Sequence, residues 1–164
     1  MSFYLNADEV FEVGLEIERN GQRFYELAAE RAQVDAVRAL CRELAEWEKG
    51  HVSVFEALRR ELPPSAREDA VFDPDSEEAT YVKAMADSHV FLQDRKVEEL
   101  VGDCHTAMDL LDLAVSFEKD SVLFYTAIQP MLSPVNGRDR VDTLMREEMG
   151  HIAMLTARRK QLEV

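Results

Sequence analysis

Residues 147–151 read Glu-Glu-Met-Gly-His, and residues 47–51 read Trp-Glu-Lys-Gly-His. The two segments start one hundred residues apart, and each places a glutamate three residues before a histidine. The same separation relates Glu18 to Glu118 and Tyr25 to Tyr125. A repeat of this kind indicates two copies of one structural unit. The sequence therefore predicts an internal duplication in which each half carries two glutamates, one histidine and one tyrosine at matching places.

Long helices are predicted in both halves. Asn6, with Glu9 three residues later, is typical of a helix N-cap with a capping box. Pro63 and Pro64 end the second helix because proline has no amide hydrogen to donate, and Thr106 can cap the third. No segment shows the sustained alternation of a strand. The four predicted long helices span about 7–32, 35–62, 106–131 and 138–161.

The second and third long helices are joined by residues 63–105, which are too many for a plain loop in a compact domain. Ser76 and Asp94 could each cap a short helix here, the second ending at Gly102. A long connection at this point is typical of two helical hairpins joined by a crossover. We expect one all-α domain, residues 1–164, folded as a four-helix bundle with a partly helical crossover.

A glutamate lies in the middle of the apolar face of each predicted long helix. An uncompensated buried charge costs several kcal/mol, so four inward glutamates need neutralisation. Two divalent cations would balance four carboxylates. A Glu and a His at i and i+3 lie about one turn apart on one helix face, so each pair could bind one ion. The small residues Gly14, Gly21, Ala114 and Ser121 are expected to leave room for a ligand such as O2, peroxide or water.

These motifs resemble the rubrerythrin branch of the ferritin-like di-iron carboxylate proteins, and the resemblance covers all four long helices. It implies a ferritin-like fold and two bound Fe ions. Oxygen-rich coordination with two imidazoles also suits Mn, and Zn would bind as well. Tyr25 and Tyr125 match tyrosines that in such proteins hydrogen-bond a ligand carboxylate from the neighbouring helix. The implied metal ligands are Glu18, Glu48, His51, Glu118, Glu148 and His151.

The resemblance implies an oxidoreductase that reduces H2O2 or O2. Two departures weaken a direct transfer of that activity. Ser121 stands where rubrerythrins carry an additional glutamate, and Cys41 and Cys104 cannot supply the four cysteines of a rubredoxin domain. Electrons would therefore come from a separate donor protein. The alternatives are a ferritin-like protein that oxidises or stores iron, and a non-enzymatic module in which metal ions only neutralise the core.

Composition and charge exclude some classes of binding partner. A net charge of −14 would repel nucleic acid. The first ten residues lack the features of a signal peptide, and no apolar run has the length of a membrane span. We expect a cytoplasmic protein without membrane association. A homodimer is expected from the resemblance and because twofold dimers are the commonest oligomers.

Four further residues near these motifs are expected to have no part in metal binding. His89 and His105 have no glutamate three residues before them and are expected at the surface or at helix caps. Cys41 is expected to be a buried thiol, roughly 10 Å along the helix from Glu48. Glu147 points about 100° away from its neighbour around the helix and is expected to be solvated.

Overall fold

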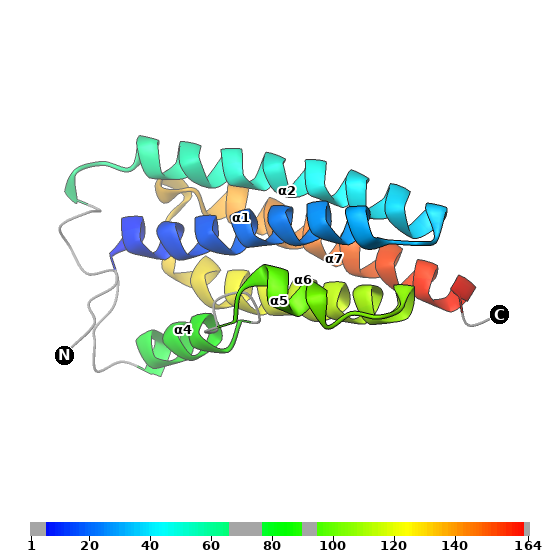
Figure 1. The fold of residues 1–164 in the computed structure, drawn as a ribbon. Helices are drawn as coiled ribbons and strands as arrows, with labels where there is room; N and C mark the ends of the chain where they lie inside the picture. Colours follow the sequence, from blue (N-terminus) through cyan, green and yellow to red (C-terminus); the bar gives the residue numbers. More distant parts are fainter. Residues whose placement is uncertain (1–5, 66–76, 90–94, 163–164) are drawn as a thin grey trace.

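Four long helices lie side by side in the computed structural model (Figure 1). The structure describes residues 6–65, 77–89 and 95–162. The long helices are α1 (Ala7–Arg31), α2 (Asp35–Glu61), α6 (Ala107–Ile128) and α7 (Arg138–Leu162). The predicted bundle is confirmed, and the predicted ranges agree closely with these bounds.

The predicted helix caps are present. The Asn6 side chain accepts a hydrogen bond from the amide of Glu9, whose carboxylate accepts one from the amide of Asn6. Thr106 and Asp109 form the same reciprocal pair at the start of α6. Each pair satisfies two amides that have no partner within the helix. These local signals explain why both helix starts could be read from the sequence.

The chain forms two hairpins, α1 with α2 and α6 with α7. Two short 3-10 helices, η1 (Gln129–Met131) and η2 (Pro134–Asn136), lie in the second hairpin connection. Gly137 follows them with a φ of 89°, a left-handed conformation that side chains disfavour. A Cβ atom there would lie 2.0 Å from Leu58 Cδ2. Glycine is therefore needed where this connection approaches α2.

The crossover contains the two expected short helices. α4 (Glu77–Ser88) packs on α6, and α5 (Val97–Gly102) packs on α1 (Figure 1). The proposed caps Ser76 and Asp94 lie outside the described residues. α5 begins at Val97 with Lys96 in the N-cap position and no side-chain cap, so its start differs from the predicted one.

The inward faces of the four long helices are buried as the periodicity predicts. Five phenylalanine side chains of the long helices are fully buried in this core: Phe11, Phe24, Phe55, Phe117 and Phe124. Among residues 6–65, 77–89 and 95–162, no helix is long and apolar enough to cross a membrane. The bundle interior is thus an apolar core interrupted at one level by polar side chains.

Candidate metal centre

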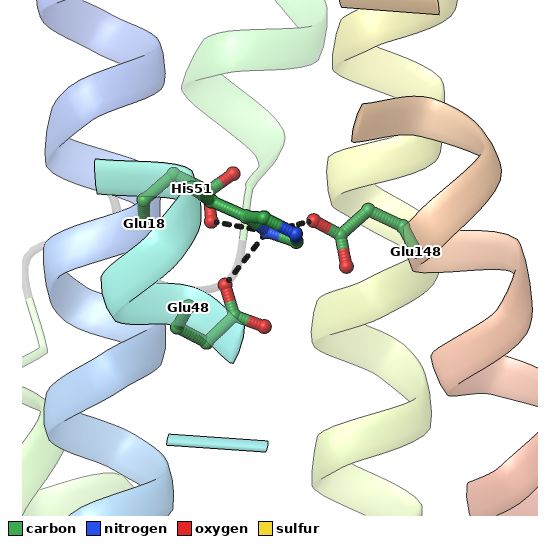
Figure 2. Close-up of side chains that lie close together, drawn as sticks. All are labelled: Glu18, Glu48, His51 and Glu148. Carbon is green, nitrogen blue, oxygen red and sulfur yellow. Dashed lines mark hydrogen bonds and ion pairs between the residues drawn. The ribbon is translucent and has the colours of Figure 1, made fainter. Parts of the chain in front are cut away.

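Four glutamates, one from each long helix, are fully buried at the centre of the bundle: Glu18, Glu48, Glu118 and Glu148. Figure 2 shows three of them pointing toward one another and toward the ring of His51. The helical periodicity aims each side chain inward. The sequence prediction that these carboxylates face the core at one level is confirmed.

The His51 ring lies among three of the carboxylates. Its Nδ1 atom is 3.2 Å from Glu18 Oε2, 3.4 Å from Glu48 Oε2 and 2.9 Å from Glu148 Oε1. Ligand atoms about 2.1 Å from one ion and at right angles to each other lie about 3 Å apart. The spacing around His51 Nδ1 is therefore that of neighbouring ligands of one ion.

The His151 ring occupies the corresponding place in the second half. Its Nδ1 atom is 2.8 Å from Glu148 Oε2, 3.5 Å from Glu118 Oε1 and 3.7 Å from Glu48 Oε1. The six side chains form two groups whose potential ligand atoms lie within 4.8 Å of one another. The first group is Glu18, Glu48, His51 and Glu148, and the second is Glu48, Glu118, Glu148 and His151. Because Glu48 and Glu148 belong to both groups, they are placed to bridge two ions.

Burial disfavours the ionised form of most of this cluster. Burial is the largest cause that raises the pKa of Glu18, Glu48 and Glu118. Burial alone would also raise the pKa of Glu148, but contacts with the two histidines and Glu118 lower it overall. Burial would lower the pKa of His51, but contacts with three carboxylates, Glu148 first, raise it. Without metal, burial therefore disfavours ionisation of Glu18, Glu48 and Glu118, and Glu148 is the carboxylate that favours an ion pair with His51.

The residues present fit two divalent ions. Neither carboxylate oxygen of Glu48 has a hydrogen-bond partner among the described residues, although the side chain is fully buried. Glu18 Oε1 and Glu118 Oε2 also lack one within that part of the chain. Buried polar atoms in proteins are normally satisfied. Four carboxylates and two imidazoles are a donor set that two such ions would both satisfy and neutralise.

The two tyrosines differ in their contacts. The Tyr25 hydroxyl donates a short hydrogen bond to Glu118 Oε1, from α1 to α6, as the resemblance implies. Burial and the nearby Glu118 carboxylate raise the pKa of Tyr25 well above its usual value, so the hydroxyl keeps its proton. The Tyr125 hydroxyl is buried and has no hydrogen-bond partner among the residues described. The expected contact between neighbouring helices is thus present for Tyr25 and absent, in that part of the chain, for Tyr125.

The expectation that glycines leave open space beside the site is wrong. A Cβ atom on Gly14 would lie 2.6 Å from Phe55 Cε1, and one on Gly21 would lie 2.4 Å from Phe117 Cζ. Aromatic rings therefore occupy the space that the missing side chains provide. The periodicity placed these glycines on the correct face, but it carries no information about which ring of another helix fills the gap.

Two predictions about nearby polar residues are only partly right. Glu147 is only partly exposed, at 37% for its side chain, and its Oε2 atom lies 3.1 Å from Nε2 of His51. His89 is fully buried, with Nε2 3.3 Å from the Ser121 hydroxyl and its ring against Phe117. Neither contact could be predicted from the helical periodicity around Glu147 or His89, since His51 and Ser121 lie on other helices. His105 is exposed and Cys41 is a buried thiol, as expected.

The fold is similar to that of a crystal structure from Thermotoga maritima, described as a candidate ferritin-like diiron-carboxylate protein. The two chains are 19% identical, the match covers 98% of each, and the TM-score is 0.74. This similarity shows the fold alone and confirms the predicted ferritin-like bundle. No protein-family model matches the chain, and no curated protein does so either. Assignment to the rubrerythrin branch stays a prediction.

Proposed function

We propose that this chain is a dinuclear metal protein of the rubrerythrin type, which reduces peroxide or O2 with electrons from a separate donor protein. The observation that carries the proposal is the pair of overlapping Glu and His groups that share Glu48 and Glu148 in a fully buried core. The fold of the Thermotoga maritima protein, whose description includes a di-iron carboxylate centre, supports the same reading.

The donor set favours iron. Oxygen ligands with one imidazole per ion suit Fe and Mn, although Zn would also bind such a site. When bound, two iron ions supply two electrons together by each cycling between the ferrous and ferric states, which matches the reduction of H2O2 to water. In this proposal Glu18 and His51 complete one position, and Glu118 and His151 complete the other.

The protein's own side chains would fix and shield the ligands. Tyr25 holds Glu118 in one orientation through its hydroxyl, and a ligand held in this way loses less freedom when a metal binds. The rings of Phe55 and Phe117 pack beside Gly14 and Gly21 and exclude bulk water from that part of the core. A dry, rigid setting strengthens the electrostatic interactions of the carboxylates.

The test uses protein loaded anaerobically with ferrous iron and mixed with H2O2, with oxidation followed by stopped-flow absorbance. We expect two ions per chain and oxidation at least ten times faster than in Glu118→Ala, which loses one ligand. The Glu43→Gln variant is the control because Glu43 is an exposed carboxylate on the same bundle. Equal oxidation rates in the wild type and Glu118→Ala would contradict a redox function at this site.

One observation favours a second candidate, a module in which metal ions only stabilise the core. Phe55 and Phe117 fill the space expected to admit a small oxidant. In that case iron-loaded protein would bind two ions, but its spectrum would stay unchanged on exposure to peroxide and O2. A third candidate is iron storage in a cage. The molecular mass measured by size-exclusion chromatography distinguishes it from both others, since the homodimer expected here is far smaller than a ferritin shell.

A further inference from the structure

The sequence repeat predicts two equivalent halves, but the two halves differ at a position that contacts the histidines of the site. Glu147 in the second half corresponds to Trp47 in the first, one hundred residues earlier. Each precedes a glutamate of the central cluster. A carboxylate accepts hydrogen bonds, whereas an indole only donates one. The two halves therefore cannot make the same contact from this position.

In one half the carboxylate contacts the imidazole across the bundle. Glu147 Oε2, on α7, lies 3.1 Å from Nε2 of His51, on α2. Nδ1 of the same ring faces the buried carboxylates. With Nε2–H donating to Glu147, the lone pair of Nδ1 points into the group of potential ligands. A carboxylate on the far nitrogen fixes the orientation of such a ring and increases its basicity as a ligand.

In the other half this contact is missing. Nδ1 of His151 faces Glu148, and its Nε2 is buried without a hydrogen-bond partner among the described residues. The Trp47 ring packs edge-on against the imidazole, with ring centroids 5.4 Å apart and an interplanar angle of 89°. Packing holds this ring, but no acceptor in the described part of the chain fixes its tautomer.

We infer that the two metal positions are inequivalent and that Glu147 is the positioning residue responsible. This inference rests on the proposed dinuclear function. The ion at the His51 position binds first and more tightly, and the ion at the His151 position binds second and exchanges more readily. Loss of a partner of this kind typically weakens metal binding by about 10–100-fold, so a difference of that order is expected between the positions.

The experiment titrates metal-free protein with Co²⁺, followed by calorimetry and by the visible absorbance of the bound ion. Wild-type protein is expected to show two phases whose dissociation constants differ at least tenfold. Anomalous diffraction from crystals holding one equivalent of Co²⁺ is expected to place that ion at the His51 position. In Glu147→Gln, which preserves shape but weakens the acceptor, the tight phase is expected to weaken about 10–100-fold.

Two further variants separate this effect from general changes in charge or stability. Trp47→Glu places beside His151 the same residue type that Glu147 places beside His51. The weak phase is therefore expected to tighten, while the tight phase stays unchanged. Glu46→Gln removes a carboxylate next to Trp47 on α2 that is 76% exposed and pairs with Lys49, so neither phase should change. A merely structural role for Glu147 would alter both phases of Glu147→Gln together. All these variants retain Tyr25, whose hydrogen bond to Glu118 is another difference between the halves.

Three results would count against the inference or its basis. Two equal phases in the wild type would overturn the inequivalence. A tight phase unchanged by Glu147→Gln would overturn the role of Glu147. Failure of the wild type to bind two Co²⁺ ions would instead overturn the proposed dinuclear function, so the two failures are distinguishable.

Discussion

Tyr25 and Tyr125 are a matched pair for testing one hydrogen bond in a buried site. Tyr25 donates to Glu118, whereas the Tyr125 hydroxyl has no acceptor among the residues that the structure describes. Removing one partner of a buried hydrogen bond costs about 1–3 kcal/mol. We expect Tyr25→Phe to lower the unfolding free energy of the metal-free protein by that amount, and Tyr125→Phe to change it little. Urea unfolding checks this, and equal losses would contradict the assigned hydrogen bond.

We expect His89 to make the stability of the protein depend on pH. Burial lowers its pKa to about 4, partly opposed by the charge of Glu148. The unfolded chain, with a histidine pKa near 6.5, then binds more protons than the native state between pH 6.5 and pH 4. Stability falls as pH falls through this window, by about 3 kcal/mol for a shift of this size. In His89→Gln that part of the pH dependence should disappear, as measured by urea unfolding at several pH values. An unchanged slope would show that His89 is not buried in the neutral form.

The candidate ligand residues could be predicted from the sequence because two separate patterns identify each of them. The spacing within a helix aims Glu48 and His51 to one side, and the repeat shows Glu148 and His151 in the same arrangement. His89 could not be predicted in this way. It follows α4 in the crossover, and its burial depends on how α4 docks on α6, which helical periodicity does not encode.

At the scale of the helices, close packing depends on particular glycines. Gly21 lets α1 approach the ring of Phe117 on α6, and an added Cβ would meet Phe117 Cζ at 2.4 Å. Overpacking of a core costs about 1–3 kcal/mol, so Gly21→Ala should lower the thermal stability. The matched control is Gly50→Ala, where a Cβ would meet nothing within 4 Å. Because alanine favours a helix by about 0.5–1 kcal/mol over glycine, that variant should be slightly more stable. Both variants losing stability equally would contradict the packing argument.

The ends of the long helices could be predicted because their signals are local. The capping boxes at Asn6 and Thr106 and the prolines after α2 act on the backbone within a few residues. The contacts of Glu147 are not local. Its direction around α7 suggests solvent, but α2 lies beside that face and brings His51 to it. Side chains between helices are therefore predictable only when the packing of the helices is also known.

At the scale of the whole molecule, the buried carboxylates link metal binding to pH and stability. Burial raises the pKa of Glu18, Glu48 and Glu118 in the metal-free protein. Above about pH 4.5 the unfolded chain ionises these groups while the native state retains protons. These three groups should therefore make the metal-free protein less stable as pH rises above about 4.5, a contribution opposite in sign to that of His89. Glu148, with its lowered pKa, is ionised in both states throughout this range.

Bound ions would replace those protons and pair with the ionised carboxylates. A ligand present at one hundred times its dissociation constant stabilises the native state by about 2.7 kcal/mol per site. The melting temperature with metal should thus exceed that in chelator, and the gap should widen from pH 5 to pH 8. His89 contributes similarly with and without metal, so its opposite pH dependence largely cancels in the difference. Equal melting temperatures at pH 7.5, or a gap that narrows as pH rises, would show that the buried carboxylates do not hold the ions.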